Sequence, residues 1–156
     1  MNSLGTIVGA YANKTGVHGF LDDHGQGIFT TLDFPGASVT EINSIVNLRY
    51  MAGFFVDSSK VEHGVVGADG MLGSAIKFPG AGLTTAQGVN NAINIAGYYG
   101  AGPAGPFHGY LLMGGQFRKI DFPRAIDTRC YAISDALAIV GRYTDATGKI
   151  HGFVAK

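Results

Sequence analysis

Hydrophobic residues along the chain gather in short segments, and Gly, Pro, Asn and Asp separate these segments from one another. The segments are rich in Val, Ile, Phe, Tyr and Thr, a composition that predicts β-strands. In the first of them Ile7, Gly9 and Tyr11 fall on one face of a strand, while Val8 falls on the other. Both faces are apolar, so we expect these strands to lie between two layers of structure.

The segments repeat with a period of about 44 residues, and four separate blocks carry the repeat. The first block is 8–11, with copies at 52–55, 96–99 and 140–143, and the second is 17–20, with copies at 62–65, 107–110 and 150–153. The third block is 33–37, with copies at 77–81 and 121–125, and the fourth is 40–47, with copies at 84–91 and 128–135. A fixed period of this size indicates a repeat architecture.

One block has a second interpretation. Residues 40–49 place Ile42, Ile45 and Val46 at the spacing of an amphipathic helix. The copy at 86–91 contains Gly88 and two Asn residues, which weaken a helix and suit a strand that enters a turn. We therefore predict four strands per unit, one for each block.

These observations predict one all-β domain over residues 1–156, a β-propeller-like repeat protein with units of about 44 residues and about 3.5 units per chain. The units run approximately over 5–48, 49–92 and 93–136, with a partial unit at 137–156. A β-trefoil or β-prism with three four-stranded units is the alternative, and the fourth copies of the first two blocks weaken it. The blocks predict fourteen strands, which is not a multiple of four, and an open sheet edge invites pairing with another chain. We therefore expect a homo-oligomer, with a dimer favoured over a monomeric four-bladed ring.

Composition narrows the functional classes. Charged residues make up only 14% of the chain, against roughly 25% in typical domains, and eleven basic residues balance eleven acidic ones. No basic excess is available to neutralise phosphates, so we expect no nucleic-acid partner. No apolar run approaches the roughly 20 residues of a membrane helix, so we expect no membrane partner, and the first residues show no signal peptide. The single cysteine, Cys130, falls on a buried strand position and is predicted to act as a small hydrophobic residue.

Residues 140–154, together with Asp33-Phe34-Pro35-Gly36-Ala37 and Gly88-Val89-Asn90-Asn91, carry a resemblance to a known family. In these motifs the chain resembles the HAF family of probable extracellular bacterial repeats, over essentially its whole length. The resemblance implies a propeller-like fold and an extracellular or cell-surface location. It implies no catalytic residues.

Four histidines share one repeat position: His18, His63, His108 and His151. A ring of imidazoles can hold a metal, but we predict a structural role in every unit, in which the ring nitrogens satisfy backbone groups of the neighbouring strand. Asp57 and Asp145 follow the first block where a turn needs a side-chain acceptor. No calcium loop, nucleophile motif or phosphate loop occurs, so we predict no catalytic residue, no metal and no cofactor.

Aromatic residues are the remaining candidates for chemistry. The repeated set Tyr11, Phe55, Tyr99 and Tyr143 is expected in the core. The less regular positions are predicted ligand contacts: Phe54, Tyr98, Tyr110, Tyr131 and Arg142. The sequence thus favours a non-enzymatic binding or scaffold module with several weak sites, between blades or at channel-end loops, for carbohydrate or another extracellular ligand. The alternatives are a propeller enzyme, such as a glycan hydrolase or lyase, and a self-assembling propeller fragment.

Overall fold

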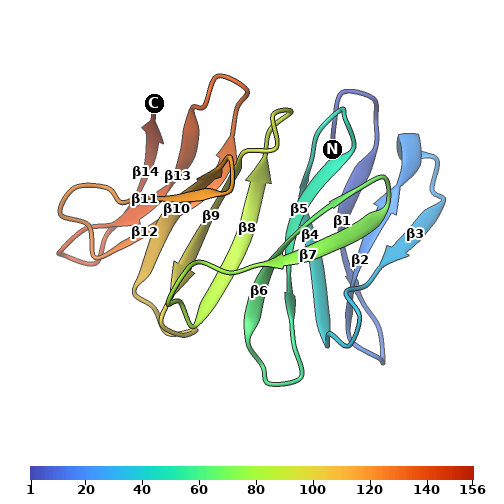
Figure 1. The fold of residues 1–156 in the computed structure, drawn as a ribbon, viewed down its shortest axis with the longest axis horizontal. Helices are drawn as coiled ribbons and strands as arrows, with labels where there is room; N and C mark the ends of the chain where they lie inside the picture. The colour runs from blue at the N-terminus through green and yellow to red at the C-terminus, as the bar shows by residue number, and fades with distance from the viewer.

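The computed structural model describes all residues 1–156, which form fourteen strands and one short 3-10 helix (Figure 1). The strands are β1 (Ile7–Ala12), β2 (Val17–Asp22), β3 (Phe29–Leu32), β4 (Val39–Ile45), β5 (Tyr50–Val56), β6 (Glu62–Ala68), β7 (Met71–Ile76), β8 (Leu83–Val89), β9 (Ile95–Gly100), β10 (Phe107–Met113), β11 (Gln116–Ile120), β12 (Asp127–Ile133), β13 (Ile139–Thr144) and β14 (Ile150–Ala155). The helix, η1 (Asp23–Gly25), lies between β2 and β3. The fold contains no helix that is long and apolar enough to span a membrane.

The strands form four groups, which we call blades 1 to 4, and within each blade consecutive strands pair antiparallel. Blade 1 contains β1–β3, blade 2 contains β4–β7, blade 3 contains β8–β11 and blade 4 contains β12–β14. A single parallel bridge between Val17 and Val39 joins blades 1 and 2. In Figure 1 the blades follow one another from the N-terminal strands on the right to the C-terminal strands on the left. They form an open arc and not a closed ring.

Three of the four predicted blocks are strands. The fourth block supplies the first strand of blades 2 to 4, the first block supplies β1, β5, β9 and β13, and the second supplies β2, β6, β10 and β14. The segment with a helical pattern is confirmed as a strand, β4. A bulge between Ile42 and Ser44 shifts its register against β5 and accounts for the irregular spacing of its apolar residues.

The third block is not a strand, and that prediction is wrong. Phe34, Phe78 and Phe122 lie in the connections between one blade and the next. Proline, which follows each of them, has no N–H for a strand ladder, and Gly36 and Gly80 adopt a φ of 77°. Each connection is held instead by a side chain of the following strand, since the Phe78 amide donates to the Thr84 hydroxyl over 3.0 Å.

The hydrophobic core lies between the blades, as the apolar faces predicted. One cluster packs Leu21 and Leu32 of blade 1 against Ile42 of blade 2. The next two clusters, centred on Tyr110 and on Cys130, fill the spaces between blades 2 and 3 and between blades 3 and 4. Each inner blade is therefore covered on both faces.

A glycine at the centre of β1, β5, β9 and β13 permits this packing. A side chain at Gly97 would meet the carbonyl oxygen of Thr85 on β8 and would lie 2.9 Å from the Tyr110 ring. Gly53 and Gly141 face the corresponding carbonyls of β4 and β12. Gly9 faces only the Phe20 ring, because blade 1 has no first strand.

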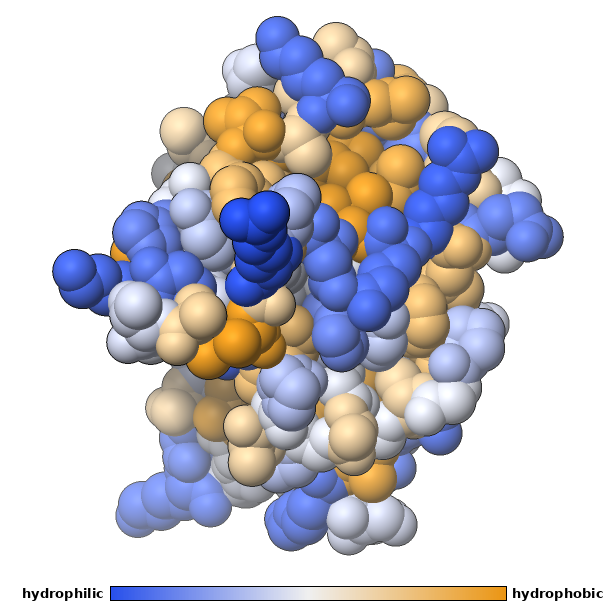
Figure 2. Space-filling view, turned by 90° about the vertical axis from the view of Figure 1, so that its left-hand side faces the viewer, coloured by the Kyte–Doolittle hydropathy of each residue, from blue (hydrophilic) through white to orange (hydrophobic).

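The two ends of the arc are incomplete in different ways. Blade 1 lacks a first strand, so one edge of β1 is unpaired, and blade 4 lacks a fourth strand, so one edge of β14 is unpaired. Figure 2 looks onto the C-terminal end and shows hydrophobic surface between hydrophilic side chains. Val140 and Val154 of blade 4 are exposed, at 41% and 65%.

Candidate functional site

A stack of aromatic rings recurs at each boundary between blades. In blade 2 the Phe34 ring from the preceding connection lies parallel to Phe55, with 3.6 Å between ring centroids. The His63 ring also stacks on Phe55, with 5.1 Å between ring centroids. The same arrangement repeats in blade 3 with Phe78, Tyr99 and His108, and in blade 4 with Phe122, Tyr143 and His151.

The histidines are structural in a different way from the one predicted. Their hydrogen-bond partners are side chains, including one carboxylate for each histidine, and not backbone groups of a neighbouring strand. His63 Nε2 lies 2.9 Å from Asp57, and His151 Nε2 lies 2.9 Å from Asp145. These two aspartates also accept backbone amides of their own turns, as predicted. Hydrogen bonds hold the pKa of Asp57 and of Asp145 below the usual range, and the largest contributions come from His63 and from the Thr147 hydroxyl.

Blade 3 departs from this pattern because its turn contains no aspartate. The connection from β9 to β10 is the loop at 101–106, rich in Gly and Pro. His108 is held from the other side, with Nδ1 2.9 Å from Asp121, which also pairs with Lys119 at 2.8 Å. The Nε2 atom of His108 makes no hydrogen bond within the chain, and the side chain is 35% exposed.

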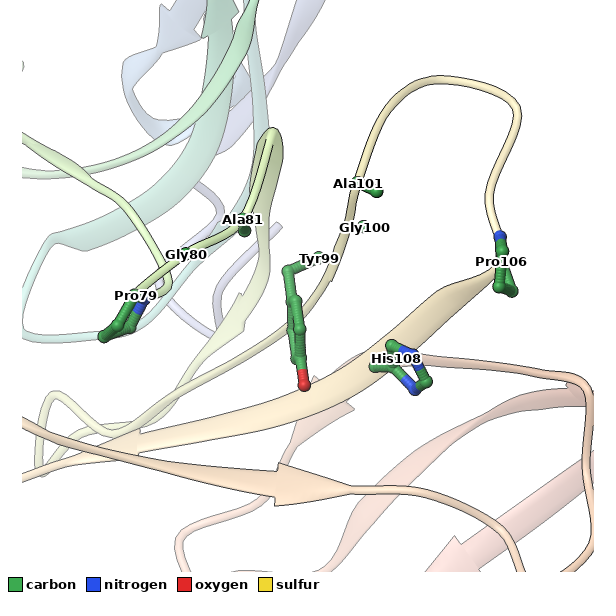
Figure 3. A pocket seen from close by; sticks show the side chains of 8 residues that line it. All are labelled: Pro79, Gly80, Ala81, Tyr99, Gly100, Ala101, Pro106 and His108. Atoms are coloured by element: carbon green, nitrogen blue, oxygen red, sulfur yellow. The ribbon is translucent and has the colours of Figure 1, made fainter.

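A cleft of about 260 Å³ opens beside this histidine (Figure 3). It is lined by Pro79, Gly80, Ala81, Tyr99, Gly100, Ala101, Pro106 and His108. In Figure 3 the Tyr99 ring stands between the Pro79 connection and His108. We call this site the His108 cleft. It combines apolar walls with one phenol hydroxyl and one imidazole edge, and burial raises the pKa of Tyr99.

Two of the predicted ligand contacts are brought together in the structure. The Tyr98 and Tyr131 rings meet edge to face at 6.4 Å, at the boundary between blades 3 and 4. The Arg129 guanidinium lies over the Tyr98 ring at 5.2 Å and over Phe107 at 4.1 Å. Burial raises the pKa of Tyr98, and the nearby Glu62 carboxylate raises it further. Burial also raises the pKa of Glu62. Sequence analysis did not identify Arg129 or Glu62.

The other predicted contacts lie elsewhere. Phe54 and Arg142 occupy the repeat position of Tyr98 in blades 2 and 4, and both are half-buried. Tyr110 was predicted to touch a ligand, and this is wrong. Its side chain is fully buried, and its hydroxyl donates to the Thr85 carbonyl over 2.9 Å. The repeated glycine of β9 leaves the space that this ring fills.

No group of three His, Cys, Asp or Glu side chains lies close enough together to hold a metal ion. Cys130 is fully buried, as its strand position predicted, and burial raises the pKa of its thiol to about 12. At this pKa the thiol is protonated at neutral pH and is a poor nucleophile.

Solved structures with a similar fold are known. The structure is similar to a mutant of the Aleuria aurantia lectin, a β-propeller, solved in complex with Fucalpha1-6GlcNAc. The TM-score is 0.56 at 12% sequence identity, over 96% of this chain and 53% of the lectin chain. This similarity shows a shared fold. A second complex of the lectin, with alpha-methyl-L-fucoside, gives a TM-score of 0.52 at 12% identity over 96% and 51% of the two chains.

The chain thus spans about half the length of the lectin that it matches. A scan against protein-family models finds no match, and a search of curated proteins finds none either. The fold is all-β and propeller-like, which is the class that the 44-residue period predicted.

The sequence predicted only a structural role for Tyr99 and His108. Both do belong to the repeated stack, but they also line the cleft. The loss of the aspartate from the turn at 101–106 was the one visible signal, because it leaves a histidine nitrogen without its usual partner.

Proposed function

We propose that the chain is a non-enzymatic carbohydrate-binding module and that the His108 cleft is its principal site. The observation that carries the proposal is the free Nε2 of His108 beside the Tyr99 ring and hydroxyl. A sugar ring presents an apolar C–H face that packs on an aromatic ring and hydroxyls that pair with an imidazole and a phenol. In the cleft the Tyr99 hydroxyl and His108 Nε2 can pair with sugar hydroxyls. Because Phe78 covers one face of Tyr99, the apolar C–H face has to pack on Pro79, Pro106 and the part of the Tyr99 ring that Phe78 leaves uncovered.

The lining favours binding over catalysis. Hydrolysis of a glycosidic bond ordinarily needs two carboxyl groups on opposite sides of the bond. No carboxylate lines the cleft, and Asp121, the nearest one to His108, is engaged with that histidine and with Lys119. The fold shared with a lectin that was solved with fucosides supports the same choice.

The stacks in blades 2 and 4 provide related positions that are weaker candidates. There the turn aspartate already occupies His63 or His151, so a ligand has to compete with an internal hydrogen bond. We expect one dominant site and weaker binding elsewhere. The resemblance to HAF repeats, the extracellular location and the dimer stay predictions alongside this proposal.

The test is titration of the chain with methyl glycosides of fucose, galactose, glucose, mannose and N-acetylglucosamine, followed by calorimetry and by saturation-transfer NMR. We expect a dissociation constant on the order of 1 mM for at least one glycoside. His108→Asn keeps an amide near the position of Nδ1 toward Asp121 but has no group at the position of Nε2, so it should weaken that binding about three- to tenfold, since one hydrogen bond is lost.

The matched control is His63→Asn, at the same repeat position with its Nε2 already paired to Asp57. It should leave the binding constant unchanged. Tyr99→Phe against Tyr143→Phe repeats the comparison for the phenol hydroxyl. If no glycoside binds, or if both histidine variants behave alike, the proposal is wrong.

A further inference from the structure

A second cavity lies on the outer face of blade 1 and has a different character. It has a volume of about 320 Å³ and is lined by Tyr11, Phe20, Phe29 and Thr31. We call it the aromatic slot. Phe29 is 64% exposed and Tyr11 is 39% exposed, so large apolar surfaces face solvent here. Its two hydroxyl groups, on Tyr11 and Thr31, lie 2.9 Å apart and are hydrogen-bonded to each other.

The same positions in blade 3 are occupied by a phenylalanine from the preceding connection. Tyr99, Tyr110 and Phe117 are the repeat equivalents of Tyr11, Phe20 and Phe29. The Phe78 ring stacks on Tyr99 at 3.6 Å and packs edge to face on Phe117 at 5.0 Å. In blades 2 and 4 the corresponding rings come from Phe34 and Phe122.

The walls of the aromatic slot already have the geometry of the filled site. The Phe20 and Phe29 rings are 5.3 Å apart at 75°, and the Tyr110 and Phe117 rings are 5.3 Å apart at 68°. An apolar cavity of about 150 Å³ is enough to hold benzene, so a phenyl ring fits in the aromatic slot.

Blade 1 also lacks the strand that follows such a phenylalanine. In blades 2 to 4 the connection leads directly into the first strand, which pairs antiparallel with the second. Only the turn that follows this strand is present in blade 1. Asn2 donates to the Val46 carbonyl and accepts the Thr6 amide, as Asn90 does with Ser134 and Asn94 in blade 3. Ahead of that point the edge of β1 is unpaired.

We propose that blade 1 is a receptor for a polypeptide segment of the repeat's own type, a Phe-Pro connection followed by a β-strand. The phenylalanine fills the aromatic slot, and the strand pairs with the free edge of β1 and completes a four-stranded blade. A hydrogen bond within the segment stabilises its conformation. In all three existing connections the hydroxyl of the threonine six residues after the phenylalanine accepts a hydrogen bond from the phenylalanine amide.

Other occupants fit the slot less well. A sugar could pack on the aromatic rings, but its hydroxyls would find only Tyr11 and Thr31, which are already hydrogen-bonded to each other. A second copy that docks as a rigid body has no phenylalanine to contribute, because Phe34, Phe78 and Phe122 are all stacked within their own chain.

The test uses the intact chain and a synthetic peptide with the sequence of residues 76–88, which contains Phe78 and ends at the repeat position just before Met1. We expect saturable binding by fluorescence anisotropy and slower amide exchange in β1 by hydrogen-exchange NMR. A peptide with Phe78→Ala should bind at least about tenfold more weakly, since both the ring burial and the stacking are lost.

Two chain variants locate the site. Phe29→Ala removes an exposed wall of the aromatic slot and should weaken binding of the unmodified peptide, whereas Val154→Ala, equally exposed at the opposite end of the arc, should not. The proposal is overturned by no binding at millimolar peptide, by equal binding of the two peptides, or by exchange changes confined to β14. It is also overturned if the chain self-associates through β1 and the peptide does not compete.

Discussion

Blades 1 and 3 are built from the same repeat, yet they differ in what surrounds them. In blade 3 the Phe78 ring covers Tyr99, Tyr110 is fully buried, and β9 pairs on both edges. In blade 1 Tyr11 is 39% exposed, and β1 pairs on one edge only. A blade is therefore complete only when a first strand, and the aromatic ring that precedes this strand, pack on it. Blade 1 has neither, so its second strand alone does not form a covered core.

The largest expected effect comes from the central glycines. Gly97→Val should lower the free energy of unfolding by about 3 kcal/mol, because the added side chain collides with the Thr85 carbonyl and the buried Tyr110 ring. Gly9→Val should cost about 1 kcal/mol, because only the half-buried Phe20 ring has to move. Urea unfolding of both variants measures the difference. Equal losses would mean that the absent first strand does not distinguish the two blades.

Truncation of the stacked tyrosines should give the next largest difference. Tyr99→Ala removes a ring stacked at 3.6 Å and should cost about 2–3 kcal/mol. Tyr11→Ala should cost less than about 1 kcal/mol, because its stacking partner is absent and only its contact with His18 and an exposed hydrogen bond to Thr31 are lost. Thermal unfolding followed by circular dichroism is sufficient to rank the two.

A smaller effect concerns one buried hydroxyl. Tyr110→Phe should cost about 1 kcal/mol, because the hydrogen bond to the Thr85 carbonyl is lost. Blade 1 has Phe20 at this position and no first-strand carbonyl to accept from a hydroxyl. The reverse change, Phe20→Tyr, should therefore leave the stability unchanged. A stabilised Phe20→Tyr variant would contradict this account.

The smallest expected effect is the pH dependence of stability that comes from Asp145, in the turn between β13 and β14. Because hydrogen bonds from Thr147 and His151 lower the pKa of Asp145, this carboxylate stabilises the fold above its ordinary pKa of about 4. That contribution is lost as the pH falls below this value and the carboxylate is protonated. Asp145→Asn should thus reduce the drop in melting temperature between pH 5 and pH 2.

Blade 1 offers the converse experiment. Asn13 accepts from the Thr15 amide and hydroxyl and lies 3.0 Å from His18, which matches the contacts of Asp145. Asn13→Asp should therefore add acid-dependent stability. A melting temperature with the same pH dependence in wild type and in both variants would show that these turns do not contribute.

Much of the fold could be predicted from the sequence because the repeat exposes it. The four copies of the second strand, the buried Cys130 and the aspartate turns all follow from local composition and period. The Phe-Pro block was misassigned as a strand, since its apolar residues match a strand while its proline and its positive-φ residues belong to a connection. Tyr110 was misassigned as a ligand contact, because only its packing against Gly97 shows that the ring turns inward.

The sequence by itself determined an all-β repeat of strands with apolar faces, because strand and turn preferences act over a few residues and recur every 44 positions. Only the tertiary structure decided which aromatic rings are covered, which histidine nitrogen is free and where a slot stays open. Those properties depend on contacts between residues about 10 to 45 positions apart and on which neighbouring strand is present, and local preference carries no information about either.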